Sequence, residues 1–478
     1  MVPTVSDPVA RASSPVVGGP LGRFARVGGG GWWTPVRVLI VMSTLAYGIG
    51  LLVDVSCLSN GWASPDRYEA LCYSDIPPLY VLRGFSEGYF PYLEVAPGGE
   101  ILEYPVLTGL FMQVSAWVMT PFVAVFPGMD PSLLFFLVNI VLLFPFLLLA
   151  VITSARIVRA RPWDAAMIAL APTMILAATI NWDLIPVGLV MAAILLWARR
   201  YPTWAGVLLG LAAAAKFYPL ILLGPWLLLC LRAGRMRDFA KLFLGTGLAW
   251  LAVNLPFMIL SWEGWAHFYE FSQTRGQDFG SIWYASSLWG VPSIPADALN
   301  LVATGTFLLL CAGIGALILF APRRPRLIPM LFLVVAAFAV TNKVYSPQYV
   351  LWLVPLAALA RPKWRDFLIW QAAELTYFGA IWWYLAGYGI EGAKGMTPQW
   401  YAFFTFVHVL GTLWFAALVV RDALVPRYDI VRTDGVPADE DDPAGGCLDD
   451  APDALPWLRK RDVPEEPDAV PAVSSSGG

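Results

Sequence analysis

One carboxylate and three cations are the residues of this chain with the clearest chemical use. Asp75 stands in CYSDIPPLYVLRGFSEGYFPYLE, a polar stretch directly after the first long apolar run. Lys216 interrupts GLAAAAKFYPLILL, Lys343 lies in TNKVYSPQYVLWLVP, and Arg275 lies in a long aromatic connection. A carboxylate can take a proton from a hydroxyl, and cations can stabilise a departing phosphate. These residue types therefore suit displacement of a phosphate leaving group by a hydroxyl.

The elements that must position these residues are membrane helices. Of the 478 residues, 58% are hydrophobic and 14% charged, which is too apolar for a soluble multidomain chain. We expect an all-α polytopic membrane protein, with a transmembrane domain over residues 36–420. Residues 1–35 and 421–478 flank it as predicted disordered tails, the second of them acidic. Apolar segments of spanning or near-spanning length include 164–180, and several are short enough to imply tilt or burial among neighbours.

Charge placement predicts which connections face which side. One set is bare and basic: RIVRAR, RR, RAGRMR, RRPR and RPKWR. By the positive-inside rule these are cytoplasmic, and the mixed, motif-like connections alternate with them on the outside. A span at 105–126 would break this alternation, so we predict an extracytoplasmic juxtamembrane helix there and about twelve spans in total. Both termini are then cytoplasmic in a plasma membrane protein, while residues 57–132 and the long loop 262–299 lie outside.

Two cysteines fall in the first outer segment. Cys57 and Cys72 would meet an oxidising compartment there, which permits a disulfide that closes a short loop. The alternative is two unpaired thiols.

The outer connections supply further candidate substrate-binding residues, each with a plainer alternative. Lys216 either meets an anion or reaches up to the interface, and Lys343 either binds substrate or belongs to an ordinary interfacial loop. Asn181 and Asp183 in NWD bind substrate or cap a helix turn. The remaining candidates are polar and aromatic residues of the outer connections: Glu103, Tyr104, Tyr218, His267, Trp283, Tyr284, Tyr345 and Gln348.

Motifs of soluble enzymes are missing from the sequence. It contains no GxxxxGK[ST], HExxH or CxxC, and no Rossmann glycine fingerprint in a suitable context. Cytoplasmic nucleotide chemistry, an ATP-driven pump and a nucleic-acid partner are therefore not indicated.

The order of SDIPPLY, PYLE, EYPVLTG, NWDL, GLAAAAKFYPLILL and NKVYSPQYVLWLVP resembles the actinobacterial glycosyltransferase family 87. The resemblance covers roughly residues 36–420, and its KFYP and SPQYVLWL motifs are fairly specific. It implies a GT-C type fold and inverting transfer of a sugar, mannose above all, from a polyprenyl phosphate to an acceptor hydroxyl on the outer face, with an α-linked product. The expected partners are the lipid-linked donor, a glycolipid or glycan acceptor and membrane lipids.

The resemblance also assigns roles. An acidic residue of the first outer loop is the base, which maps onto Asp75. Relatives in the wider superfold often carry two acids there with a divalent metal, whereas this chain has Ser74-Asp75-Ile76, so we favour a mechanism without metal or cofactor. Glu103 is a competitor or a partner of Asp75 in that role.

Two other functions stay open at this stage. A polyprenyl-phosphate-arabinose donor would need only a few different hydrogen bonds. A lipid flippase or transporter would carry internal repeats and ionisable groups near the midplane, for which Glu374 is the main candidate. The sequence shows no convincing repeat, and its charges gather at one face, so we favour the transferase.

Overall fold

Helices make up all the regular structure of residues 7–9, 11–13, 31–388, 395–433 and 441–455, which are those that this computed structural model describes. The helices that are long and apolar enough to cross a membrane are α2 (Pro35–Asn60), α5 (Val106–Val125), α6 (Pro131–Ile157), α12 (Met236–Leu260), α15 (Ala296–Phe320) and α19 (Pro398–Leu424). The prediction of an all-α polytopic membrane protein is confirmed, whereas the total of about twelve spans stays a prediction.

Shorter apolar helices complete the bundle. They are α9 (Leu184–Ala198), α10 (Pro202–Ala215), η4 (Tyr218–Leu222) with α11 (Leu223–Arg232), α16 (Leu327–Thr341), and η5 (Pro347–Tyr349) with α17 (Val350–Ala360). The last long helix, α18 (Trp364–Gly387), pairs with α19. Every residue of α17 is buried, which explains how so short an apolar helix is kept from lipid.

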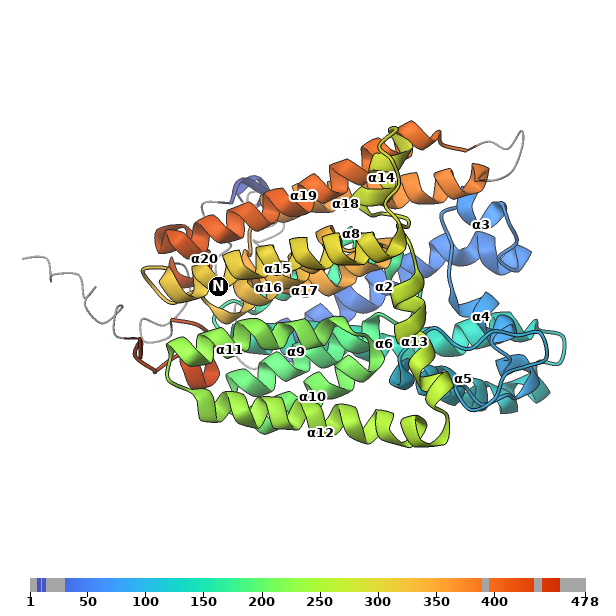
Figure 1. Ribbon diagram of the computed structural model, residues 1–478, viewed down its shortest axis with the longest axis horizontal. Helices are drawn as coiled ribbons and strands as arrows, with labels where there is room; N and C mark the ends of the chain where they lie inside the picture. The colour runs from blue at the N-terminus through green and yellow to red at the C-terminus, as the bar shows by residue number, and fades with distance from the viewer. Residues whose placement is uncertain (1–6, 10, 14–30, 389–394, 434–440, 456–478) are drawn as a thin grey trace, which may run out of the picture.

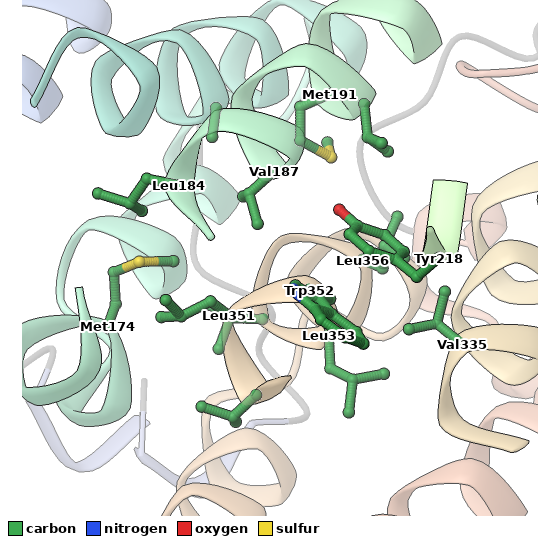
Figure 2. Packing of buried hydrophobic residues seen from close by; sticks show 14 of the residues in the cluster. Met174, Leu184, Val187, Met191, Tyr218, Val335, Leu351, Trp352, Leu353 and Leu356 are labelled. Carbon is green, nitrogen blue, oxygen red and sulfur yellow. The ribbon is translucent and has the colours of Figure 1, made fainter. Parts of the chain in front are cut away.

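The core packs around α17. Figure 2 shows Leu351, Leu353 and Leu356 of this helix among buried side chains of α9 and α16, such as Val187 and Val335. Since these helices bury apolar residues on nearly all sides, they form a rigid centre on which the outer helices rest.

Prolines and short polar side chains set the helix ends. The Thr34 side chain accepts from the Arg37 N–H at the start of α2, and Asp130 accepts from the Ser132 N–H at 2.8 Å at the start of α6. Both helices have proline at their first position, where its missing N–H is no loss. Lys216 is extended between α10 and η4, so the chain turns where KFYP predicts a break.

The molecule has two chemically different ends (Figure 1). At one end, here called the Asp75 end, lie α3 (Asp66–Glu69), α4 (Ile76–Leu82), η2 (Phe85–Glu87) and α5. Near this end, α13 (Trp262–Thr274) and α14 (Ile282–Leu288) run across the direction of the long helices. The opposite end, here called the basic end, carries η6 (Pro426–Tyr428) and α20 (Ile430–Thr433). The predicted outer loop 262–299 is therefore largely helical.

Helix α5 starts beside the end of α10. The Thr108 hydroxyl donates to the Ala215 carbonyl at 2.7 Å, and α5 then continues at the Asp75 end, where it contacts α6 and η2 (Figure 1). Length and composition alone would let α5 span a membrane. The juxtamembrane assignment of 105–126 stays a prediction.

The apolar segment 164–180 is not one helix. It is divided into η3 (Pro162–Ala165), α7 (Ala166–Ala169) and α8 (Pro172–Ala177). Pro172 cannot donate a backbone hydrogen bond to α7, so the chain turns at Ala171 and starts a new helix. Its expected near-spanning length was therefore wrong as a description of one element.

The predicted disorder of the two tails is wrong for the parts that the structure describes. The Asp7 carboxylate accepts from the Trp364 N–H at 2.7 Å, at the start of α18. Residues 421–433 extend α19 and form η6 and α20, and residues 441–455, with η7 (Gly446–Leu448), pack on the basic end. Composition suggested a solvated acidic tail, but aspartates of this tail form ion pairs with arginines of the bundle and of the tail itself. Residues 7–9, 11–13, 31–35, 421–433 and 441–455 are the parts of 1–35 and 421–478 that the structure describes, and the rest of both tails lies outside the described residues.

A disulfide joins the end of α2 to the Asp75 segment. Cys57 and Cys72 are bonded with their Cα atoms 6.0 Å apart, and the Trp62 indole donates to the Cys72 carbonyl at 3.1 Å. The bridge therefore ties the residues directly before Asp75 to a long apolar helix.

Replacing Cys57 and Cys72 together with serine is expected to lower stability by about 3 kcal/mol, because a loop of this length is released in the unfolded chain. The measurement is the Tm of the purified protein in detergent, with Cys311→Ser as the control. Dithiothreitol should bring the wild type down to the Tm of the double variant. An unchanged Tm in the double variant would contradict the structural role of the bridge.

Candidate active site

The backbone around Asp75 is anchored to the chain that leads into α9. The Asp75 N–H donates to the Ile180 carbonyl at 2.8 Å, and the Ser74 hydroxyl donates to the Thr179 carbonyl at 2.7 Å. Asp75 directly precedes α4, whose first turn holds Pro77. Because Pro77 has no N–H, it leaves no backbone donor unsatisfied at that turn. Two hydrogen bonds and the disulfide thus fix the position of the carboxylate.

Two tyrosine hydroxyls hold the Asp75 carboxylate, one on each oxygen. Tyr73 donates to Oδ1 at 2.7 Å, and Tyr104 donates to Oδ2 at 3.2 Å. Burial raises the pKa of Asp75; the two hydroxyls and Lys216 oppose this shift, while Glu103 adds to it. The side chain is still partly exposed, so a reactant can reach it. A carboxylate with a raised pKa is a stronger base than an ordinary aspartate.

Glu103 is bound to an arginine. Arg83 donates to both of its oxygens, at 2.7 and 3.0 Å, and also lies 3.1 Å from Glu100. A bidentate pair of this kind uses both oxygens of the carboxylate. Arg83 therefore occupies both oxygens of Glu103, and the pair fixes the segment that carries Tyr104.

Lys216 and Asp75 contact the same tyrosine, because Lys216 lies over the Tyr104 ring and Asp75 accepts from its hydroxyl. The Nζ of Lys216 is 3.0 Å from Asp183 and 5.1 Å from the centre of the Tyr104 ring. Asp183 is fully buried and also accepts from the Trp352 indole at 3.2 Å. The Asn181 side chain accepts from the Asp183 N–H at 3.0 Å. Asn181 thus holds the backbone of Asp183, and Asp183 holds Lys216.

Lys216 lines a cavity of about 780 Å³ together with Arg275 and Lys343. The cavity lies between α13, α15 and the turns that follow α10 and α16. One wall is aromatic: Trp352 stacks on Tyr218 at 4.5 Å and on Tyr349 at 4.0 Å. Figure 2 shows the Tyr218 and Trp352 rings together. Three cations and a flat apolar wall suit a ligand that is anionic at one point and apolar at another.

Hydrogen bonds hold Lys343 and Arg275, the other two cations of the cavity, in place. Lys343 Nζ donates to Asn300 Oδ1 at 2.6 Å and to the Gln273 carbonyl at 3.1 Å. Arg275 Nε donates to Asp278 at 2.6 Å, and the Asp278 N–H donates to the Lys343 carbonyl at 2.9 Å. Burial and the nearby Arg275 lower the pKa of Lys343. An anion placed between the two cations would relieve this repulsion.

A comparison with protein families matches part of the chain. The model of glycosyltransferase family 87 matches residues 114–341. The protein is therefore similar to glycosyltransferase family 87 over a little under half of its length. The protein is a membrane glycosyltransferase. The matched residues include Asp183, Lys216 and Arg275, whereas Asp75, Tyr104 and Lys343 lie outside them. A search of curated proteins found no match.

Of the ten predicted substrate-binding residues, only Tyr218 lines the cavity. Glu103, Tyr104, Asn181 and Asp183 are described above, and five others lie elsewhere around it. His267 is on α13, with its ring toward Phe271. Trp283 and Tyr284 serve packing, because the Trp283 indole donates to the Thr341 carbonyl and the Tyr284 hydroxyl pairs with that of Tyr384. Tyr345 and Gln348 are buried beside the turn that carries Lys343. These five residues shape the surroundings of the site.

Three other residues of the candidate site are not among the residues predicted from the sequence. Tyr73 stands two residues before Asp75, a spacing that could have suggested a contact. Asn300, near the start of α15, is a polar residue in an apolar helix, which is a detectable signal. Trp352 gives no such signal, because an aromatic residue in an apolar helix is ordinary.

Glu374 belongs to a closed polar cluster between α18 and α19. It accepts from the Thr412 hydroxyl at 2.9 Å and lies 3.3 Å from His408 Nδ1. Its exposed fraction is 2%, and the Trp370 indole also donates to it. Glu374, the main candidate for a transporter function, is therefore held by hydrogen bonds that join α18 to α19.

Removing the charge of Asp183 should leave Lys216 without its buried partner. We expect Asp183→Asn to lower stability by about 3 kcal/mol, the usual result of breaking a buried pair from one side. Lys216→Met in the same chain should recover part of the loss, because no unpaired charge then remains. The Tm values of the two single variants and the double variant form the test, and additive losses would contradict the pairing.

Proposed function

We propose that this protein transfers a sugar from a polyprenyl-phosphate donor to an acceptor hydroxyl at the Asp75 end, with inversion at the anomeric carbon and an α-linked product. One observation carries the proposal. The cavity with three cations begins at Lys216, and Lys216 and Asp75 both contact Tyr104, one at its ring and the other at its hydroxyl. A base and a phosphate site are thus neighbours, as a displacement of phosphate requires.

The cations are the proposed phosphate site. Lys216 stands at the inner edge, next to the base, and Lys343 and Arg275 face the same cavity from the turns beyond. Their N–H groups can donate charge-assisted hydrogen bonds to phosphate oxygens. Asp183 keeps Lys216 in place whether or not a ligand is bound, so no rearrangement is needed when phosphate charge develops.

An apolar groove continues the cavity and suits the isoprenoid chain of the donor. It has a volume of about 280 Å³ and lies between α11, α15 and α16. Phe307 and Val334 line it one helical turn beyond the cavity residues Thr304 and Phe338. Polar cavity and apolar groove together match a phosphate with a long hydrocarbon tail.

The proposed reaction is a single displacement. The acceptor oxygen bonds to the anomeric carbon while its proton passes to Asp75. The bond between that carbon and the phosphate oxygen breaks, and its electron pair leaves with the polyprenyl phosphate, whose charge the cations stabilise. Asp75 accepts the proton on the oxygen that faces the acceptor, and we place the acceptor on the Tyr73 side, away from Lys216.

Mannose is the sugar that we propose, on the likeness of the SDIPPLY, KFYP and NKVYSPQY motifs to mannosyltransferases of this family. Competition between polyprenyl-phosphate mannose and arabinose in one transfer assay decides between the two donors.

We propose a GT-C type fold in the plasma membrane, with the Asp75 end outside and both termini cytoplasmic, because the bare basic connections lie at the opposite end. The acceptor class is a glycolipid or a glycan.

We further propose that the reaction needs no metal ion. Asp75 is held by two tyrosines, and Arg83 occupies both oxygens of Glu103, the other nearby acid. The proposal thus assigns to Lys216, Arg275 and Lys343 the charge stabilisation that a divalent ion would supply.

Asp75→Asn should reduce transfer by at least about a hundredfold, because the amide cannot accept the proton of the acceptor hydroxyl. The measurement is incorporation of label from polyprenyl-phospho-mannose into a membrane lipid extract by the purified protein. Tm and donor binding should stay at wild-type values. Asp66→Asn is the matched control, since Asp66 is an exposed acid of the same segment. Turnover retained by Asp75→Asn would end the assignment of the base.

The pH dependence of transfer should show the raised pKa of Asp75. The base works when it is deprotonated, so the rate falls as the pH drops through this pKa, above the usual range near 3.9. Tyr104→Phe removes a hydrogen bond that favours the carboxylate, so the acidic limb of this variant's pH–rate profile should move to higher pH. A limb that stays in place or moves to lower pH would show that another group sets it.

A further inference from the structure

Residues 441–455, here called the C-terminal segment, occupy the basic end far from Asp75. Arg232, at the end of α11, has an exposed fraction of 0% and donates to the Asp453 carboxylate through Nε at 3.0 Å and Nη2 at 2.7 Å. Its backbone carbonyl also accepts from the Ala454 N–H at 2.7 Å. A fully buried guanidinium with a bidentate partner needs that partner, since an unpaired buried charge is strongly unfavourable.

The same segment binds the start of α16 and the turn before it. Asp442 accepts from the N–H of Leu327, the first residue of α16, at 2.7 Å. Arg324 donates to the carbonyls of Ala451 at 2.8 Å and Leu448 at 2.6 Å. A carboxylate at a helix start is favoured by the helix dipole as well as by the hydrogen bond.

A third attachment joins the segment to α9. The Trp197 indole donates to the Gly445 carbonyl at 2.8 Å. Gly446 has a φ of +58°, and a Cβ at this position would lie 2.1 Å from the Trp197 carbonyl oxygen. Only glycine allows this approach, so the backbone of the segment is fitted closely to the end of α9.

These attachments reach the helices that line the apolar groove. Arg232 of α11 also donates through Nη1 to the carbonyl of Ile318 in α15, at 2.7 Å. Ile318 lines the groove, as do Leu228 of α11 and Val334 of α16. The C-terminal segment therefore connects the ends of all three groove helices, because Asp453 binds Arg232 of α11, which in turn binds α15, and Asp442 binds the start of α16.

We propose that the C-terminal segment is a built-in clamp that holds α11, α15 and α16 at the spacing that accepts a long apolar chain. The occupant of the basic end is therefore the C-terminal segment of the same chain. Five aspartates lie among its residues, against a basic end formed by the short arginine connections. The consequence for the groove rests on the proposed function, whereas the docking does not.

Docking is tested first, without any activity measurement. Cys447 lies within the segment and is partly covered, so its rate of labelling by a maleimide reports release. Asp453→Asn should raise the rate roughly tenfold or more in the full chain, because Arg232 loses its carboxylate. Gly446→Val tests the same docking from the α9 side. Asp450→Asn is the matched control, since Asp450 and its partner Arg200 are both more than half exposed and should affect docking little.

The effect on the groove is tested with two phosphate lipids of different length. Decaprenyl phosphate would fill cavity and groove, and geranyl phosphate only the cavity. Asp453→Asn and Gly446→Val should raise the Kd of decaprenyl phosphate about fivefold and leave that of geranyl phosphate unchanged.

Three results would overturn the proposal or its basis, each in a different way. Equal labelling of Cys447 in wild type and both variants would refute docking. Faster labelling with an unchanged Kd for decaprenyl phosphate would refute the effect on the groove. Wild-type protein that binds neither lipid would refute the proposed function, and Cys447 labelling would still decide whether the segment docks.

Discussion

The ion pair between Lys216 and Asp183 is the interaction on which the site depends. A lysine at the end of an apolar helix needs a partner, and Asp183 supplies one from full burial at 3.0 Å. The Trp352 indole binds the same carboxylate, so the aromatic wall of the cavity is built on this pair. The Tyr104 ring lies against the lysine and its hydroxyl donates to Asp75, which joins the proposed base to the cation.

Much of this arrangement could be predicted from local sequence. A proline two residues after Phe217 breaks the helix, so KFYP places Lys216 at a turn. The alternation of bare basic and mixed connections separates the two ends, because charge placement follows the membrane and not the details of packing. Asp75, Lys216, Arg275 and Lys343 were therefore assigned to one face before any contact was known, and three of them line one cavity.

What could not be predicted depends on direction and long-range pairing. Trp283, Tyr284 and Tyr345 are polar aromatics near the site, but composition does not tell whether a ring faces a cavity or a neighbouring helix. The contact of Glu103 could not be predicted either, because it depends on where the fold places Arg83, twenty residues away. The C-terminal segment was misjudged for the same reason: an acidic stretch is usually solvated, and only the folded chain shows that Asp453 meets Arg232.

The central claim is that the donor phosphate lies against Lys216, one tyrosine away from Asp75. A cryo-electron microscopy structure of the full chain with decaprenyl phosphate tests it most directly. The account predicts density for the phosphate within hydrogen-bonding distance of Lys216 and of Arg275 or Lys343, with the chain running between α11, α15 and α16. A phosphate bound elsewhere, with this cavity empty, would contradict the account.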